Sequence, residues 1–433
     1  MTNQELLHLL HCEVIPAIGC TEPIAVALCV ARAKEKLGTE PDAIEVYLSK
    51  NVYKNALAVG IPNTGMTGLP IAIALGATVG RSEYMLEVLR DADATSVEYA
   101  KEYMQRVEAK IAIKYDAPSI LYIQVVVSKD GQQAVATIQD EHTKFVDEVS
   151  QISEVSDLGV LGEEAKGKEA KGEEELTLKR VYEFATSVDI EELDFLLKGA
   201  EMNIQAAETS FANEYGHKLG RLLHSNTLQQ NDKLQKLFGD TIFTKIVSYT
   251  CGACDARMSG AMVPVMSNSG SGNQGISCSV PVYLYAKENN CDEELTRRAL
   301  AMSNLTVIYI KQSLGRLSAL CGCVVAATGS AAGITLLMGG GYEEITYAIK
   351  NMIANISGMI CDGAKPGCAL KVTSGVSTAI FSAYLAMQHS YADSTEGIVE
   401  DDIDRTIRNL TRIGHDGMQV TDDLILDIMT HKG

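Results

Sequence analysis

Cysteines are the residues of this chain whose grouping could do chemistry. Cys321 and Cys323 form one close pair, Cys361 and Cys368 form a second pair forty residues later, and Cys20 stands alone near the start of the chain. Thiolates grouped in this way are what an iron–sulfur cluster or a zinc ion needs. For any single cysteine here, a small buried apolar residue is the simpler interpretation. The grouping, rather than any one residue, therefore indicates a metal centre.

A third pair, Cys251 and Cys254, has the C-x2-C spacing of a zinc knuckle or a redox dithiol. Structural zinc sites usually combine two such pairs, and no second pair follows. No thioredoxin-like βαβ pattern precedes the pair either. Zinc and redox chemistry therefore remain alternatives to an iron–sulfur cluster.

A Gly/Ser/Asn-rich loop at 267–275 is the second chemical feature. Its polar side chains alternate with glycines and lack the Lys of a Walker loop, and they are Ser267, Asn268, Ser269, Ser271 and Asn273. Backbone N–H groups and hydroxyls in such a loop suit a carboxylate or another small anion. The alternative is a linker, but apolar runs flank the loop. We expect a substrate-binding loop, with Arg257 as its cation.

Lysines near these motifs are candidates for proton transfer. Lys311 precedes Cys321 by ten residues, and Lys365 and Lys371 follow Cys361. A lysine buried among apolar residues has its pKa lowered and can act as a base. The alternative for each lysine is a surface side chain whose ammonium group reaches water.

Composition limits the function classes. The 433 residues carry a net charge of −19, which argues against nucleic acid and anionic membranes as partners and favours a small molecule. Eleven cysteines are too few for a disulfide scaffold, and the first residues lack a signal-peptide pattern, so a cytoplasmic location is expected. The uncharged segment 317–342 is long enough for a bilayer, but we interpret it as a buried core helix. A homodimer is compatible with the sequence, which carries no signal for oligomeric state.

Hydrophobic periodicity predicts the elements that position these residues. Residues 4–36 read as two helices interrupted between Pro16 and Gly19, so Cys20 falls at a helix start, where backbone N–H groups favour a thiolate. Residues 43–52 read as a strand, and 119–127 with 133–138 as a hairpin. After 176 the pattern is helical, and the predicted helices are 191–223, 234–248, 293–312, 317–337, 343–360, 373–387 and 403–413.

These patterns predict an α+β fold with a large, mostly helical domain that includes the N-terminal helix and a smaller inserted α/β domain. The charged tract at 163–175 lacks large apolar residues and reads as a solvated linker. The predicted division is a helical segment at 1–36 that packs on the helical domain, an α/β domain at 37–160, a linker at 161–176 and a helical catalytic domain at 177–433.

Six long strings carry a family resemblance that covers nearly the whole chain. They are GCTEP (19–23), NTGMTGLPIAIALG (63–76), DARMSGAMVPVMSNSGSGNQG (255–275), GRLSALCG (315–322), GMICDGAKPGCALKV (358–372) and DGMQVTD (416–422). Together they resemble the L-cysteine desulfidase family, which is related to the alpha chain of iron–sulfur L-serine dehydratases.

The resemblance implies an oxygen-sensitive [4Fe-4S] cluster, held by three cysteines, with one iron left open for substrate. Position by position, Cys20, Cys321 and Cys361 match the ligand motifs, and Cys323 and Cys368 become neighbours. Such an iron would act as a Lewis acid in the conversion of L-cysteine to pyruvate, ammonia and sulfide. The N-terminal domain lacks the Ser-His-Thr signature of serine dehydratases, which argues against a serine-specific enzyme.

Four residues are nominated as the base that takes the Cα proton, and they are Lys371, Lys365, Lys311 and Glu22. Sequence alone does not choose among them, because the choice needs geometry. The expected function is thus a carbon–sulfur lyase, with L-serine dehydratase as the alternative and a non-catalytic metal-binding or redox protein as the second alternative.

Overall fold

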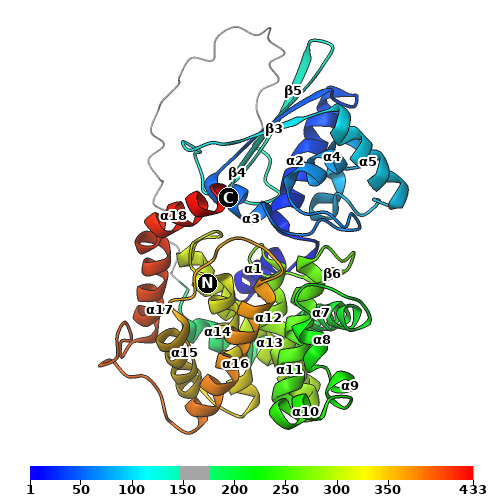
Figure 1. Ribbon diagram of the computed structural model, residues 1–433. Helices are drawn as coiled ribbons and strands as arrows, with labels where there is room; N and C mark the ends of the chain where they lie inside the picture. Colours follow the sequence, from blue (N-terminus) through cyan, green and yellow to red (C-terminus); the bar gives the residue numbers. More distant parts are fainter. Residues whose placement is uncertain (147–175, 433) are drawn as a thin grey trace.

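The protein is described by a computed structural model over residues 1–146 and 176–432. Figure 1 shows a sheet with helices on one side of it above a larger assembly of helices. The described part of the chain is mostly helical with small sheets, which confirms the predicted α+β class. The charged tract at 163–175 lies outside the described residues, and the division into domains stays a prediction.

A four-stranded sheet has the order β3-β2-β4-β5, in which β2 runs parallel to β3 and antiparallel to β4. The predicted hairpin is confirmed, because β4 and β5 are joined at Asp130 and Gly131, which both have positive φ. The strands are β1 (Pro16–Ile18), β2 (Ala43–Leu48), β3 (Ala109–Ile113), β4 (Tyr122–Lys129), β5 (Gln132–Gln139) and β6 (Pro264–Met266).

Helices cover one face of this sheet and share a hydrophobic core with it (Figure 1). Alternate strand residues such as Ile44, Val125 and Ile138 point into that core. The helices and turns of this region are α2 (Thr21–Leu37), α3 (Lys50–Ala56), α4 (Leu69–Thr78), η1 (Ser82–Glu87) and α5 (Ala94–Arg106).

The predicted packing of residues 1–36 is wrong for the second helix. Leu6 and Leu10 of α1 (Asn3–Glu13) do join the core of the helical region. Helix α2, however, packs between the sheet and α4, and its buried residues belong to the core of the sheet region. Because it has neighbours on several sides, α2 is apolar almost all round from Ile24 to Ala33.

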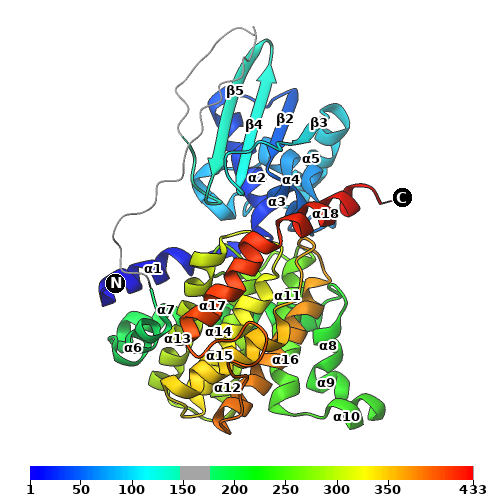
Figure 2. The ribbon, with the colours of Figure 1, turned by 90° about the vertical axis from the view of Figure 1, so that its left-hand side faces the viewer.

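The helical region surrounds a central helix, α14, which contacts α12, α13, α15 and α16 (Figure 2). Its residues from Cys323 to Leu337 are buried, which confirms that the uncharged segment is a core helix. The elements of this region are α6 (Leu178–Ser187), η2 (Ile190–Leu193), α7 (Asp194–Ala212), α8 (Leu219–Leu223), α9 (Ser225–Leu228), α10 (Asp232–Phe238), α11 (Ile242–Met258), α12 (Gly272–Glu288), α13 (Glu293–Leu314), α14 (Gly322–Leu337), α15 (Tyr342–Ile356), α16 (Cys368–Met387), α17 (Ile403–Arg412), η3 (Ile413–Gly417) and α18 (Gln419–Thr430).

Several boundaries differ from the predicted ones. The helix predicted at 191–223 breaks into η2, α7 and α8. The helix predicted at 234–248 is divided at Gly239, whose φ of 66° ends α10. Helix α14 starts at Gly322 rather than at 317, because residues 319–321 form backbone hydrogen bonds to another segment. Half of the predicted binding loop belongs to α12, which the periodicity does not predict.

Helix α16 is the one described helix long and apolar enough to cross a membrane by length and composition. Of its most apolar stretch, 44% is buried inside the protein, where α16 contacts α11, α14 and α15. A core helix of a large protein has the same composition, so this feature is weak evidence for a membrane span.

Candidate functional site

An isolated β-bridge joins two of the cysteine motifs. Leu320 pairs with Ile360, the N–H of Cys321 donates to the Met359 carbonyl at 2.9 Å, and the N–H of Cys361 donates to the Ala319 carbonyl at 2.7 Å. The 39 residues between the two cysteines form α14 and α15, which pack against each other and return the chain to the first cysteine. Two cysteines far apart in sequence are therefore neighbours at the open end of that pair.

Cys20 reaches the same place from the N-terminal part of the chain. It is the N-cap of α2, as predicted, and it follows Gly19, whose φ of 76° is unfavourable for any side chain. The Cys20 Sγ donates to Glu22 Oε2 at 3.2 Å, and Asn55 Nδ2 donates to Glu22 Oε1 at 3.1 Å. Cys20 is thus tied to a side chain of α3.

The three cysteines line one cavity of about 100 Å³, which we call the cysteine cavity. It lies where α3 of the sheet region meets the helical region, and its polar lining contains a cation, a carboxylate and several amides. The lining residues are Cys20, Glu22, Asn55, Arg257, Ser271, Asn273, Gln274, Cys321, Gly322, Cys323, Cys361, Gly363, Ala364, Cys368, Lys371 and Val372.

Four helices begin at this cavity. Cys20 and Cys321 are the N-caps of α2 and α14, Ser271 is the N-cap of α12, and Cys368 is the first residue of α16. The N-terminus of a helix carries partial positive charge and free N–H groups. The cavity is therefore suited to anionic groups, such as metal-bound thiolates and a substrate carboxylate.

Burial nevertheless keeps the Cys20 and Cys321 thiols neutral in the absence of a metal. Burial, together with the nearby Glu22, raises the pKa of Cys20 well above its ordinary value. Burial and the neighbouring Cys361 raise the pKa of Cys321 to about 12. The predicted stabilisation of a Cys20 thiolate by its helix start is thus outweighed by desolvation. A bound cation is what would hold these sulfurs as thiolates, with release of their protons.

The donor set fits a cluster better than a single ion. Among the described residues, no three His, Cys, Asp or Glu side chains are grouped closely enough to hold one metal ion. In a [4Fe-4S] cluster each cysteine binds a different iron, so the ligands should surround a space rather than converge on one point. Cys20, Cys321 and Cys361 surround the cysteine cavity in this manner. Their role as ligands stays a prediction.

Arg257 is the buried cation of the site. It lies in the last turn of α11 with 2% of its surface exposed. Its Nη1 donates to Asn273 Oδ1 at 3.1 Å, its Nη2 donates to Thr21 Oγ1 at 3.4 Å, and its Nε has no hydrogen-bond partner in the described chain. Arg257 and Asn273 thus lie together at the cavity, with unused N–H capacity on the guanidinium.

The loop at 267–275 divides into two parts with different roles. Ser271 and Asn273 line the cavity. Ser267, Asn268 and Ser269 do not, because their side chains are used inside the protein. Ser267 Oγ donates to the Ile15 carbonyl, Asn268 Nδ2 donates to Asn304, and Ser269 Oγ donates to Asn268 Oδ1. These three residues fix the loop and are absent from the cavity lining, so their predicted contact with substrate gains no support here.

The four candidate bases are separated by their positions. Glu22 and Lys371 line the cysteine cavity, whereas Lys365 and Lys311 do not. Burial opposes the charge on Lys371, but its hydrogen bond to Asp362 outweighs burial and raises the pKa of the lysine. Lys365 pairs with the same Asp362 at 2.5 Å. Lys371 is therefore a fixed cation rather than a base.

Lys311 is buried behind the cavity. Its Nζ donates to the Arg316 carbonyl at 2.9 Å, and burial, together with the charge of Arg316, lowers the pKa of Lys311 to about 8. The lowered pKa agrees with the expectation for a buried lysine. Its position outside the cavity lining makes it a weaker candidate for direct contact with substrate than Glu22.

Cys251 and Cys254 lie inside α11 rather than on a metal-binding turn. Both are fully buried, and burial is the main reason that the pKa of each thiol is raised. Neither lines the cysteine cavity. A helix interior does not offer the turn geometry of a zinc knuckle, so the zinc alternative loses its support here.

Three polar residues near the cavity have no counterpart among the predicted site residues. Asn55 of α3 and Gln274 of α12 line it, and both have an unpaired amide oxygen. His142 follows β5, is buried against Gly270, and has an unpaired Nε2. Gln274 lies within the family motif at 255–275, which is a signal that could have identified it. Asn55 and His142 stand in segments without a motif.

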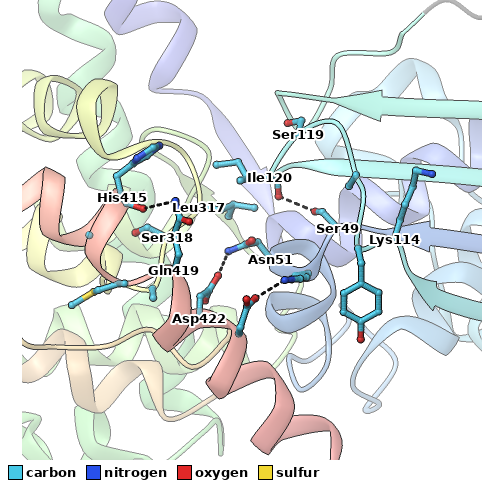
Figure 3. A pocket seen from close by; sticks show the side chains of 17 residues that line it. Ser49, Asn51, Lys114, Ser119, Ile120, Leu317, Ser318, His415, Gln419 and Asp422 are labelled. Carbon is cyan, nitrogen blue, oxygen red and sulfur yellow. Dashed lines mark hydrogen bonds and ion pairs between the residues drawn. The ribbon is translucent and has the colours of Figure 1, made fainter. Parts of the chain in front are cut away.

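A second, larger cavity of about 310 Å³ lies between the sheet region and the C-terminal helices, and we call it the interface cavity (Figure 3). Its polar groups bond to one another. Asn51 Nδ2 donates to Asp422 Oδ2 at 2.5 Å, and Ser49 Oγ donates to the Ile120 carbonyl at 2.8 Å. The residues that line it are Ser49, Lys50, Asn51, Lys114, Tyr115, Ala117, Ser119, Ile120, Leu317, Ser318, Ala319, Gly414, His415, Met418, Gln419, Asp422 and Asp423.

A buried ion pair, which we call the Lys54–Asp422 pair, lies beside residues that line the two cavities. Lys54 of α3 has 2% of its side chain exposed and pairs with Asp422 of α18. The Lys54 ammonium also lies 3.5 Å from the Cys361 carbonyl, and a Cβ at Gly363 would lie 2.6 Å from the Lys54 carbonyl. The cluster-motif segment thus packs tightly on α3, and α18 holds α3 from the other side.

Comparison with known proteins identifies the family of this chain. A family model for the serine dehydratase alpha chain matches residues 83–427, a range that includes Cys321 and Cys361 but not Cys20. A UPF0597 protein of Bacteroides fragilis is 56% identical over 432 residues, covering 100% of this chain and 99% of the relative. UPF0597 proteins of Porphyromonas gingivalis and Oleidesulfovibrio alaskensis are 48% and 45% identical, covering 100% and 98% of this chain and 99% and 97% of the relatives. The chain therefore belongs to the serine dehydratase alpha chain family, together with the UPF0597 proteins.

Proposed function

We propose that this protein is an iron–sulfur-dependent L-cysteine desulfidase, which eliminates sulfide from L-cysteine to yield pyruvate and ammonia. One observation supports this most. Cys20, Cys321 and Cys361, from three distant segments, line a single cavity together with the buried cation Arg257. Cys323 and Cys368 line the same cavity, but their thiols donate to the Lys371 carbonyl at 3.0 Å and to the Gly363 carbonyl at 3.7 Å. Three cysteine ligands would leave a cluster one open coordination position.

A [4Fe-4S] cluster held by Cys20, Cys321 and Cys361 would supply Lewis acidity at an open iron, which weakens the Cβ–S bond of the substrate. Arg257 binds the substrate carboxylate with the N–H groups that its contacts to Asn273 and Thr21 leave free. Because the guanidinium is buried, this ion pair forms away from water and fixes the Cα–H direction.

Glu22 takes the Cα proton in this proposal. Its carboxyl group lines the cavity and accepts a hydrogen bond from Asn55 Nδ2 on one oxygen. A Cys20 thiolate bound to the cluster would no longer donate to the other oxygen, which would leave that oxygen free to take the proton. Loss of the Cα proton and cleavage of the Cβ–S bond convert L-cysteine to aminoacrylate and hydrogen sulfide. Aminoacrylate tautomerises to the imine, which water hydrolyses to pyruvate and ammonia. No pyridoxal phosphate is needed.

Lys371 adds a fixed positive charge at the same cavity. Its ammonium group is held by Asp362 and by the Ile360 carbonyl at 2.8 Å, so it stays protonated and in place. A fixed cation stabilises the negative charge that the departing sulfide carries. Lys311 remains the second candidate for the base.

L-serine dehydratase activity is the second candidate function. The family model matched by residues 83–427 is that of the serine dehydratase alpha chain, and water and sulfide leave from the same carbon. The expected partner is in both cases a small amino acid. The net charge of −19 disfavours nucleic acid and anionic membranes, and a cytoplasmic location belongs to the same proposal.

One assay tests these functions. Protein reconstituted under anaerobic conditions with iron and sulfide should show a broad brown absorbance and should release pyruvate and sulfide from L-cysteine. Pyruvate from L-serine but not from L-cysteine would replace the desulfidase by the dehydratase. A colourless protein that is active with zinc alone, or a brown protein that releases pyruvate from neither substrate nor from L-threonine, would contradict the proposal.

A further inference from the structure

Three of the residues that line the cysteine cavity each contribute one buried polar atom with no hydrogen-bond partner within the described part of the chain. They are Asn55 Oδ1, Gln274 Oε1 and Arg257 Nε. Their residues are 9%, 3% and 2% exposed. A buried polar atom left unpaired destabilises the fold by about 1–3 kcal/mol. Three such atoms around one cavity indicate that something else completes their hydrogen bonds.

The two amide groups can each be oriented in only one way. Asn55 Nδ2 donates to the Glu22 carboxyl group, and Gln274 Nε2 donates to the Asn268 carbonyl at 3.2 Å. A carbonyl oxygen only accepts, and so does a carboxylate, so turning either amide over would set oxygen against oxygen. The unpaired atoms are therefore acceptors on Asn55 and Gln274 and a donor on Arg257.

Two acceptors and one donor match the two ends of an α-amino acid. An α-ammonium group donates three hydrogen bonds and needs acceptors, whereas an α-carboxylate needs donors. Arg257 already serves the carboxylate in the proposed function. We propose that Asn55 and Gln274 form the subsite for the substrate α-ammonium group, an inference that rests on the proposed function.

The subsite is built from both parts of the molecule. Asn55 stands on α3, directly after Lys54, whose buried pair with Asp422 and close approach to Gly363 fix that helix. Gln274 stands in the first turn of α12, and a Cβ at Gly322 would lie 3.2 Å from its Oε1. Both amides are thus held in place before any ligand arrives, which makes them selective.

This placement also assigns a specificity role. Acids that lack the ammonium group, such as propionate, would leave both amide oxygens unpaired. A site built to hydrogen-bond a polar group rejects analogues that lack this group, because its own buried atoms stay unsatisfied. The subsite therefore selects α-amino acids over thiols and carboxylic acids without an amino group.

Binding of L-alanine and propionate to the anaerobically reconstituted protein tests the subsite. Neither ligand carries a leaving group on Cβ, so neither is turned over, and they differ only in the ammonium group. Isothermal titration calorimetry compares wild type with Asn55→Ala and Gln274→Met, the second of which keeps the side-chain volume. Each variant should weaken L-alanine binding by about tenfold, the loss of one hydrogen bond to a charged group, and should change propionate binding less than about twofold.

Asn51→Ala is the matched control. Asn51 lies on the same helix α3, four residues earlier, but lines the interface cavity and bonds to Asp422. It should leave the ratio of the two dissociation constants unchanged. If Asn55→Ala does not fold, Gln274→Met decides alone.

The inference is overturned if wild type does not bind L-alanine, if both ligands lose affinity equally in the variants, or if neither variant changes the ratio. A selective loss for L-alanine supports the subsite even where wild type releases no pyruvate, in which case the proposed function fails alone. Pyruvate release by wild type with an unchanged ratio in both variants refutes the subsite and leaves the proposed function standing.

Discussion

The smaller of the two cavities of this protein has more unpaired polar atoms on its lining residues than the larger one. The interface cavity is about 310 Å³ and the cysteine cavity about 100 Å³. Of the eight residues with an unpaired buried polar atom in the described chain, three line the cysteine cavity and none lines the interface cavity. The unmet hydrogen-bonding capacity of the lining, rather than the volume, therefore distinguishes the candidate site.

Replacing Cys361 by Ser is expected to have the largest effect on this contrast. Removal of one of three ligands should lower pyruvate release by more than about 100-fold, the upper end of the effect of losing an outer partner of a metal site. Iron per chain should fall with it, as measured by a colorimetric iron assay. Cys251→Ser, at a more deeply buried cysteine outside the cavity, should retain iron and activity. Full iron in the Cys361 variant would disprove the ligand assignment, and loss of function only in the Cys251 variant would favour a redox protein.

Removal of the Lys54–Asp422 pair is expected to have the second largest effect. Lys54→Met leaves Asp422 without its buried partner and should lower the free energy of unfolding by about 3 kcal/mol. Lys50→Met, on the same helix, removes an exposed pair with Asp423 and should cost less than about 1 kcal/mol. Urea denaturation measures both. Equal losses of unfolding free energy would show that the buried Lys54–Asp422 pair stabilises the fold no more than the exposed Lys50–Asp423 pair.

His142 offers a smaller, pH-dependent effect. Burial lowers its pKa to about 4, against about 6.5 in the unfolded chain, with Glu22, Arg316, Lys311 and Arg257 as the facing charges. The unfolded state therefore binds more protons between these values, and the stability contributed by His142 is lost as the pH falls from about 6.5 to about 4. The slope is about 1.4 kcal/mol per pH unit in the middle of this window.

His142→Asn should remove this slope. Urea denaturation of both proteins between pH 4.5 and pH 6.5 checks it, and the difference between them isolates the histidine from other titrating groups. Parallel stability curves would mean that His142 is protonated in the native state as readily as in the unfolded chain.

Gln419→Ala in the interface cavity should have the smallest effect. Gln419 Nε2 donates to the His415 carbonyl at 3.3 Å near the surface, so its removal should change the free energy of unfolding by less than about 0.5 kcal/mol. Pyruvate release should stay within about twofold of wild type. A large loss of activity would make the interface cavity part of the functional machinery and would end the contrast between the cavities.

The chain sequence predicts the centre of the site better than its periphery. The strings around Cys321 and Cys361 indicate a shared site, but the β-bridge that joins them has no periodic signal. Ser267 and Asn268 look like ligand contacts, yet their polar atoms satisfy the Ile15 carbonyl and Asn304. Polar loop residues serve backbone groups as readily as ligands, and one sequence does not separate the two uses.

Asn55 shows a second limit of prediction from sequence, which is that long-range contacts leave no local pattern. It stands in a short helix without a motif, and its partner Glu22 lies 33 residues earlier. The contact exists because α2 leads across the sheet and β2 leads back, which places α3 beside the start of α2. The same crossing explains why α2 packs on the sheet rather than on the helical region, since its apolar residues serve two neighbours. Tertiary packing, rather than local sequence pattern, decides both the contact of Asn55 with Glu22 and the packing of α2 on the sheet.

The Lys54–Asp422 pair also has a consequence for the synthesis of the protein. The cysteine cavity takes lining residues from Cys20 to Val372, and the ion pair that supports α3 needs Asp422 of α18. A chain emerging from the ribosome folds its first parts early, but these contacts join residues hundreds of positions apart. The pocket is therefore complete only after nearly all of the chain has left the ribosome. Any cluster would therefore be inserted late, after the residues from Cys20 to Asp422 have been synthesised and brought together.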